Sequence, residues 1–282
     1  LGVALLDVGT RSTDLVPRAN LFAGRVTWDV DSHLRVGTIV TNGDPSGATD
    51  NSLVGLDAVW RTSTFAGDKN FAVGLWGAGS TGDVDSGRRT GWGLKVDYPN
   101  DLWDLYAIYR DFGDSLEPAL GFLPRPGTRQ YDLGGSFQPR PKGGPFSWVR
   151  QFFFELEGSL VTDLSGQTQS WRVFTAPFNA RTQSGEHLEV NWAPQFEHLD
   201  EPFEIADGVV IPPGDYTFHR FRAEAFSSDH RPLRAGATVW FGSFFDGTLT
   251  QVSTYVNWTG PGGHLQAGLK ASSNYGSLPW GS

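Results

Sequence analysis

Two glutamates in a run of alternating residues could carry acid–base chemistry. Glu155 and Glu157 are separated by one residue in "QFFFELEGSL". A strand would therefore place their Cα atoms on one face, about 6.5–7 Å apart. A retaining glycosidase needs two carboxyl groups about 5–5.5 Å apart, and this spacing permits such a site. Charged side chains are also the ordinary content of a water-filled barrel, and we favour that interpretation for both glutamates.

Residues 227–230, "SSDH", hold the letters of a catalytic triad. Adjacent residues in one turn do not converge easily into a triad's hydrogen-bond chain, so we interpret the segment as a polar hairpin turn. The chain has neither a GxSxG nucleophile elbow nor a glycine-rich phosphate loop. We therefore assign no catalytic residue and no cofactor, and we favour a protein that is not an enzyme. The chain also has an enzymatic interpretation, the least favoured of three, in which a hydrolase built on a β-barrel places Ser and His on neighbouring strands.

Two acidic segments are weak candidates for binding calcium. Asp83 and Asp85 begin like an EF-hand loop, but the later ligands and the closing glutamate are missing. Glu197, Asp200 and Glu201 gather carboxylate oxygens within a few residues. We interpret the first segment as an acidic hairpin loop and the second as a solvated acidic rim, so we assign no metal site. The six histidines show no HExxH or other paired spacing, so the sequence does not predict a zinc site.

Composition favours short strands joined by tight turns. The 282 residues include 36 glycines and 17 prolines, which are costly in helices, and 13% of the residues are aromatic, although the mean hydropathy is −0.30. The net charge of −9 argues against a nucleic-acid partner. The absence of cysteine excludes disulfides and thiolate metal sites. Because the sequence lacks methionine and opens on "LGVALLDVGTR", we expect a portion of a longer protein.

Alternation with a period of two dominates the chain. In "SLVGLDAVWR", one face would carry Val54, Leu56 and Trp60, and the other would carry Asp57 and Arg61. This period is typical of a sheet with one apolar and one polar face. No stretch reaches the roughly 18 apolar residues of a transmembrane helix.

The pattern predicts an all-β fold. About fifteen alternating segments of roughly ten residues match the ~9–11 residues of a tilted membrane-spanning strand. We predict a single domain over residues 1–282: an antiparallel meander of about 14–16 strands that forms all or part of a large transmembrane β-barrel. Ordered inter-strand loops are expected at about residues 111–127 and 198–216. The first should fold onto the rim or into the lumen, with Arg125 paired to a carboxylate.

The two faces of the predicted strands are interpreted as lumen and lipid. Mid-strand charges indicate a polar lumen, and aromatic residues near strand ends are typical of interfacial girdles. The expected lumen-facing charges are Arg25, Asp57, Arg61, Lys95, Glu155, Glu157, Glu189, Arg220, Arg222 and Glu224. The expected lipid-facing aromatics are Trp28, Trp60, Tyr98, Trp103, Tyr109, Phe152, Phe154, Trp192 and Trp258.

Two stiff, apolar-rich interruptions of the alternation carry a family resemblance. Their phrases are Phe112-Gly113, Gly121-Phe122, Pro124-Arg125, Pro202-Phe203-Glu204 and "IPPGDY" at residues 211–216. In these phrases, and at residues 1–11 and 243–250, the chain resembles the DUF5916 family of bacterial outer-membrane proteins. The resemblance runs through essentially the whole chain and implies further barrel strands on both sides of it. Members of the family usually carry an N-terminal carbohydrate-binding-family-9-like domain, which these residues do not include. Some relatives are labelled hydrolases, but no residue of this sequence supports that activity.

These observations predict a Gram-negative outer-membrane β-barrel of unknown specific role, either a porin-like pore or transport component or a scaffold. Its expected partners are the lipid bilayer and a periplasmic domain or other envelope proteins. A soluble carbohydrate-binding or carbohydrate-active β-protein, with exposed tryptophans stacking on sugars, is the alternative. Detergent dependence separates the two, because only the membrane protein requires it.

Overall fold

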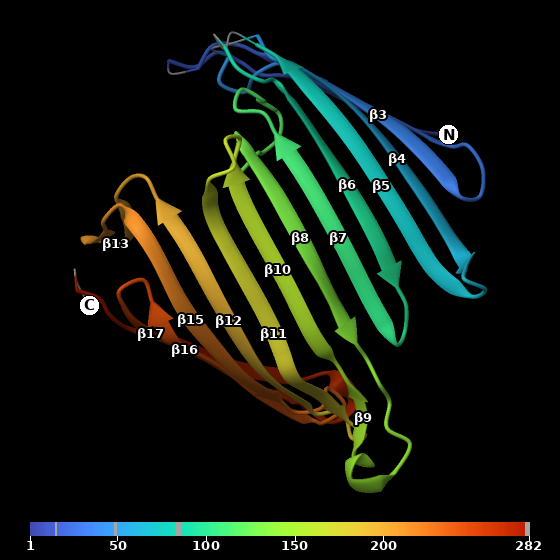
Figure 1. The fold of residues 1–282 in the computed structure, drawn as a ribbon, viewed down its shortest axis with the longest axis vertical. Helices are drawn as coiled ribbons and strands as arrows, with labels where there is room; N and C mark the ends of the chain where they lie inside the picture. Colours follow the sequence, from blue (N-terminus) through green and yellow to red (C-terminus); the bar gives the residue numbers. More distant parts are fainter. Residues whose placement is uncertain (15, 48–49, 83–85, 280–282) are drawn as a thin grey trace. The chain divides into compact units, whose positions relative to one another are not determined.

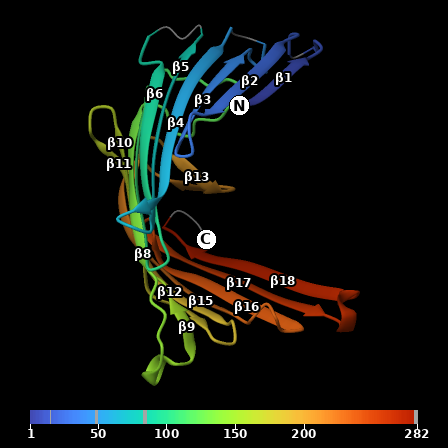
Figure 2. The same cartoon turned by 90° about the vertical axis from the view of Figure 1, so that its right-hand side faces the viewer.

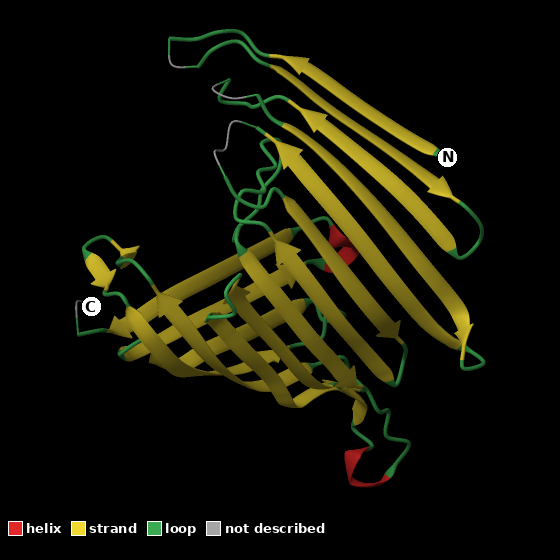
Figure 3. Cartoon of the chain, turned by 45° about the horizontal axis from the view of Figure 1, so that its top comes forward, coloured by secondary structure: helices red, strands yellow, loops and turns green. Residues whose placement is uncertain are grey.

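Antiparallel hairpins follow one another along the chain. The computed structural model describes residues 1–14, 16–47, 50–82 and 86–279. The strands are β1 (Gly2–Gly9), β2 (Asn20–Asp29), β3 (Leu34–Asn42), β4 (Ser52–Phe65), β5 (Lys69–Thr81), β6 (Thr90–Pro99), β7 (Trp103–Phe112), β8 (Thr128–Phe137), β9 (Val149–Phe152), β10 (Phe154–Asp163), β11 (Thr168–Thr182), β12 (His187–Leu199), β13 (Phe203–Ala206), β14 (Val209–Ile211), β15 (Gly214–Phe226), β16 (Leu233–Phe244), β17 (Gly247–Thr259) and β18 (Gln266–Ser277). Figure 3 shows how fully strands dominate the chain, with short 3-10 turns at Gly144–Phe146 and Pro261–Gly263.

The strands form one 16-stranded sheet in which neighbours in space are nearly always neighbours in sequence. The order runs β1 to β8, then β10, β11, β12, β15, β16, β17 and β18, with β9 paired to β11 (Figures 1 and 2). β13 and β14 form a separate hairpin between β12 and β15. The prediction of an all-β, antiparallel fold is confirmed. Among the described residues, β1 and β18 are the two ends of the sheet and do not pair with each other, so the sheet does not close into a barrel.

Helices contribute little to this fold. Among the described residues, no helical segment has the length and apolar character needed to cross a bilayer.

The chain divides into two compact units. The first comprises Leu1–Asn100, Leu105–Asp132 and Val161–Gln167, and the second comprises Asp101–Asp104, Leu133–Leu160 and Thr168–Ser282. Each unit is described by itself.

In the first unit, the strand register sorts side chains onto an apolar and a polar face. One cross-strand row contains Val26, Thr38 and Leu56, while the next row contains Gly37 and Asp57 on the opposite face. Because directly opposed residues in antiparallel strands share a face, the alternation of each strand is in phase with that of its neighbours. The apolar face is exposed, with Leu56 having 64% of its surface accessible.

Residues 113–127, which join β7 to β8, fold back onto the polar face of the first unit. Leu116 is buried at the position where a side chain on Gly91 would lie. The backbone N–H of Glu117 donates to the Ser80 hydroxyl at 3.0 Å, and its carbonyl accepts from the Asn51 amide at 3.0 Å. These hydrogen bonds tie the loop to β5 and to the start of β4. The pairing of Arg125 with a carboxylate stays a prediction.

In the second unit, short apolar clusters hold the additional strands in place. Ile211 at the end of β14 packs with Tyr216, Phe218 and Phe245. Since Tyr216 and Phe218 alternate with Thr217 on β15, the β13–β14 hairpin lies over one face of that strand. In the other cluster, Val149 and Phe152 of β9 pack with Ala180 of β11.

The first testable consequence concerns Gly113, where the chain leaves β7. A Cβ atom there would overlap the carbonyl oxygen of Arg88, which is backbone and cannot rotate away. We expect Gly113→Ala to lower the free energy of unfolding by about 1–3 kcal/mol or more, measured by urea denaturation. Gly9→Ala is the matched control, because nothing lies within 4 Å of that Cβ position. Equal stability of the two variants would show that the loop is not docked as described.

Candidate functional site

The strongest polar cluster of the second unit lies on adjacent strands β12 and β15. His187, Glu189 and Asn191 alternate along β12, and Arg222 and Glu224 alternate along β15. The register places Glu189 directly opposite Glu224, and Asn191 directly opposite Arg222. All five side chains therefore share one face. Together with Asn179 of β11 and Glu155 of β10, which hydrogen bond to this group, we call them the Arg222 cluster.

Arg222 makes the central contacts of this cluster. Its Nη2 donates to Glu189 Oε1 at 2.5 Å, and its Nε donates to Asn191 Oδ1 at 2.6 Å. Its Nη1 lies 3.4 Å from Glu224 Oε2. The guanidinium carbon lies 5.4 Å from the Phe174 ring centre and 5.3 Å from that of Trp240. Contacts with two carboxylates and two rings fix the orientation of the guanidinium.

His187 links the arginine to the neighbouring strands. Its Nε2 lies 2.9 Å from Asn179 Oδ1 and 3.4 Å from Glu189 Oε2, both of which are acceptors. Nδ2 of Asn179 donates to Glu155 Oε1 at 3.2 Å. These contacts place a hydrogen on Nε2 and connect β10, β11, β12 and β15 through one set of polar side chains.

The cluster is well shielded from solvent. The side chains of Glu189 and Glu224 are 6% and 9% exposed, and that of His187 is 22% exposed. One ligand atom from each of these three residues lies within 4.8 Å of the others. The described residues thus bring together a histidine and two carboxylates that are close enough to share one ion.

A turn beside the cluster holds a second charged group. Glu186 precedes β12 and accepts hydrogen bonds from the hydroxyls of Ser184 and Thr182, the latter at 2.5 Å, and from Arg231. These three donors lower the pKa of Glu186 to about 2. The ion pair with Arg231 links the β11–β12 turn to the β15–β16 turn.

In the first unit, the expected lumen charges form separate pairs. Arg25 and Asp57 are joined by two hydrogen bonds of 2.5 and 2.9 Å that pass over Gly37, where a Cβ would meet both side chains. Lys95 pairs with Asp97 at 2.8 Å, and Arg61 lies in the register row of Ala72 and Asp97. The structure thus places all four predicted charges of this unit on one polar face.

The remaining predicted charges belong to the second unit. Arg220 donates to the backbone carbonyls of Gly242 and Leu249 and to the side chain of Gln251, and its guanidinium carbon lies 5.9 Å from the Phe244 ring centre, so its described partners are neutral groups. Glu155 and Glu157 alternate along β10, and Glu155 is the one that reaches the Arg222 cluster through Asn179. Their assignment to a lumen stays a prediction.

Most predicted girdle aromatics lie on the opposite, apolar faces. Trp28, Trp60, Trp103, Phe154, Trp192 and Trp258 are exposed. Tyr98 and Tyr109 are half-buried, and Tyr109 packs between Trp92 and Tyr131. Phe152 differs from the expectation: the run "QFFFELEGSL" breaks at Phe153 into two strands, and Phe152 is buried against Val149, Ala180 and Phe178. A buried core residue of this kind is not part of an exposed girdle.

The calcium candidates within the described residues are not members of the Arg222 cluster. Asp83 and Asp85 lie outside the described residues. Asp200 contacts His198 Nε2 at 3.0 Å, while Asp215 contacts the Nδ1 of the same ring at 2.5 Å. Glu197 and Glu201 do not belong to the His187, Glu189 and Glu224 group that the described residues bring together. Calcium binding at residues 197–201 stays a prediction.

The "SSDH" segment uses its hydroxyls within the hairpin turn. The Ser227 hydroxyl accepts from the backbone N–H of Ala235 at 2.8 Å, and the Ser228 hydroxyl accepts from that of His230 at 3.3 Å. These contacts are turn contacts and do not form a triad.

Sequence reasoning missed His187, Asn179 and Asn191 as members of the cluster. The signal that could have found two of them is the alternation His187-Glu189-Asn191 along one strand face. Asn179 joins through strand pairing alone. No family model, no curated protein and no solved structure matches the chain. The resemblance to the DUF5916 family stays a prediction.

Arg222 offers a test of the cluster as a unit. Arg222→Gln leaves two shielded carboxylates without their guanidinium, so we expect the free energy of unfolding to fall by about 3–5 kcal/mol in urea denaturation. Arg172→Gln is the matched control, because Arg172 stacks on the same Phe174 ring at 5.5 Å and should lose only about 0.5–2 kcal/mol of cation–π attraction. Similar losses in both variants would assign the effect of Arg222 to stacking rather than to charge.

Proposed function

We propose that the chain forms part of the wall of a Gram-negative outer-membrane β-barrel, as a pore, transport or scaffold component. Each apolar face would contact lipid, and each polar face would line an aqueous lumen. The observation that supports this proposal is the segregation of side chains. On β4, exposed Leu56 is next to the ion-paired Asp57. On β10, exposed Leu156 is next to the hydrogen-bonded Glu155.

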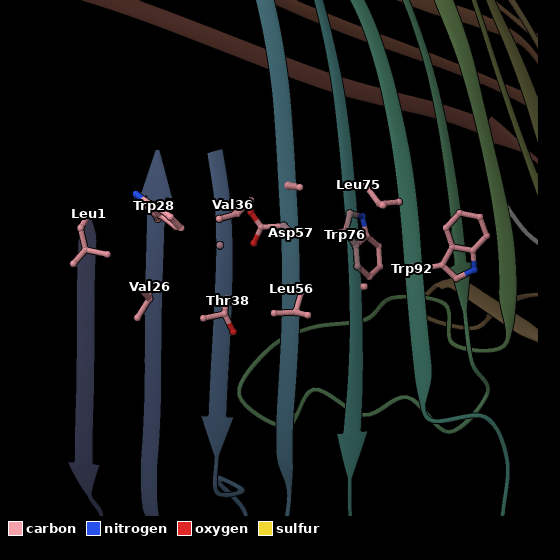
Figure 4. Close-up of a pocket in the computed structure, with 13 residues that line it drawn as sticks. Leu1, Val26, Trp28, Val36, Thr38, Leu56, Asp57, Leu75, Trp76 and Trp92 are labelled. Carbon is pink, nitrogen blue, oxygen red and sulfur yellow. The ribbon is translucent and has the colours of Figure 1, made fainter. Parts of the chain in front are cut away.

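The exposed apolar residues of the first unit support a face that is covered by lipid. Among the described residues of the first unit, Leu5, Val54, Leu56 and Leu75 each have more than half of their surface accessible. Contiguous apolar patches beyond a few hundred Å² mark interaction surfaces. The apolar face also has a hollow of about 710 Å³, in which Figure 4 places Val26, Trp28, Leu56, Leu75 and Trp92. Acyl chains are suitable occupants of such a surface.

Strand length and pairing fit the same proposal. The membrane-facing strands would include β2 with 10 residues and β4 with 14, against the ~9–11 needed to cross the hydrocarbon core at a tilt. Hydrocarbon cannot satisfy backbone polar groups, so the outer edges of β1 and β18 must be paired in a membrane. The family resemblance, with its further barrel strands, is one source of such pairing.

The polar faces support a lumen with water in it. Paired charges of both signs, such as Arg25 with Asp57 and Arg110 with Asp132, give a wall of little net charge in the first unit. A pore lined in this way would select weakly between anions and cations. A scaffold role would use the same charges to hold an inserted loop or domain, and conductance across a lipid bilayer separates the two roles.

Spin labels on opposite faces test the membrane orientation. The chain has no cysteine, so Leu56→Cys and Thr27→Cys can each be labelled without altering any other residue. These positions lie in adjacent register rows but on opposite faces. In lipid vesicles, electron paramagnetic resonance should show that the Leu56 label is accessible to oxygen, which partitions into lipid. The Thr27 label should instead be accessible to a water-soluble nickel chelate.

A chain that stays monodisperse without detergent, with both labels equally accessible to the nickel chelate, would contradict the proposal. Leu156→Cys and Ser253→Cys give the same comparison in the second unit, since Leu156 is 60% exposed and Ser253 shares a register row with Glu224 and Thr238.

A further inference from the structure

The register of β12 and β15 creates an unfavourable arrangement of charge. Glu189 and Glu224 are directly opposed on adjacent antiparallel strands. Like charges at such positions destabilise a sheet, and shielding from solvent increases the cost. Arg222 contacts both carboxylates, yet it supplies only one positive charge for the two. A third carboxylate, that of Glu155, is connected to the same group through Asn179. The cluster therefore has more carboxylates than cationic groups to balance them.

His187 adds a donor of a different chemical type. It is two residues from Glu189 on the same strand face, and Glu224 lies across the strand pair. One nitrogen of the imidazole and one oxygen of each carboxylate lie within 4.8 Å of one another. An ion about 2.0–2.2 Å from each ligand atom would hold tetrahedral ligand atoms about 3.3–3.6 Å apart. Side-chain rotations that draw the three atoms closer together would therefore accompany binding. Three protein ligands with a fourth position open to water form a recurrent zinc arrangement.

We propose that His187, Glu189 and Glu224 bind one divalent transition-metal ion of the zinc type on the polar face of β12 and β15. One imidazole and two carboxylates suit Zn²⁺, which accepts nitrogen and oxygen ligands in a four-coordinate site. Calcium is less suited, because it requires six to eight oxygen ligands. The site does not depend on the proposed membrane location, since all three ligands belong to one compact unit.

Arg222 is the counter-ion of the metal-free cluster. Its Nε contact with Asn191 and its stacking on Phe174 and Trp240 do not involve the carboxylates. These contacts can hold the side chain while Glu189 turns toward the metal. To bind the metal through Nε2, His187 would adopt the neutral tautomer that carries its hydrogen on Nδ1, and Asn179 would lose the hydrogen bond from Nε2. Metal and guanidinium thus compete for the same negative charge.

Isothermal titration calorimetry tests the proposal directly. The chain is produced without a polyhistidine tag, dialysed against EDTA and then against metal-free buffer, and titrated with ZnCl₂. We expect one Zn²⁺ per chain. His187→Ala and Glu224→Gln should each weaken the binding by about tenfold or more. Circular dichroism of each variant establishes that the strand content is retained.

His198→Ala is the matched control. His198 also lies between two carboxylates, those of Asp200 and Asp215, but on another part of β12. We expect it to leave the zinc affinity unchanged, and millimolar Ca²⁺ should not displace the bound Zn²⁺. The proposal is overturned if no saturable binding occurs, or if His198→Ala weakens the binding as much as His187→Ala does.

Arg222→Gln provides a variant whose effect has the opposite sign. Removing the competing positive charge should raise the zinc affinity by on the order of threefold or more. Zinc should also raise the thermal midpoint of this variant more than that of the unaltered chain, because only the metal then neutralises the carboxylates. A lower zinc affinity in Arg222→Gln would show that the guanidinium is not a competitor and would overturn this part of the proposal.

Discussion

The two-residue period of the extended chain is the constraint on which the rest of this structure depends. It sends alternate side chains to opposite faces. On β4, for example, Leu56 lies on the exposed apolar face, so Asp57 must lie on the other face. Pairing in register then adds the rows of successive strands into continuous surfaces. The first unit thereby acquires an apolar face that is exposed and a polar face whose charges must find partners across the strands.

Small residues on the polar face allow those partners to meet. The Arg25–Asp57 pair crosses β3 at Gly37, where a Cβ would lie 2.5 Å from the guanidinium. Likewise, the Trp76 indole lies over Gly93 of the adjacent strand, 2.5 Å from the position of a Cβ. Glycine in a strand is usually a cost in stability. In this sheet it provides the space that long side chains need to lie flat across a neighbouring strand.

Alternation was sufficient to predict the all-β antiparallel sheet, and it correctly separated charges such as Asp57 and Glu189 from the exposed apolar residues. It could not give the register, which depends on turn geometry and on the β13–β14 hairpin inserted between β12 and β15. The opposition of Glu189 and Glu224, and hence the Arg222 cluster, was therefore not predictable. Phe152 was assigned to an exposed face because alternation does not reveal that β9 leaves the main strand order to pair with β11.

The two polar faces differ in how they neutralise charge. In the first unit, Arg25–Asp57 and Arg110–Asp132 are pairs of one cation and one anion, and each is locally neutral. In the second unit, one guanidinium serves two directly opposed carboxylates, which a sheet does not need for its stability. A threonine at residue 224 would remove the repulsion. The residue paired with Glu224 on β16 is such an uncharged residue, Thr238. In the proposed zinc site, the second carboxylate would meet a cation other than Arg222.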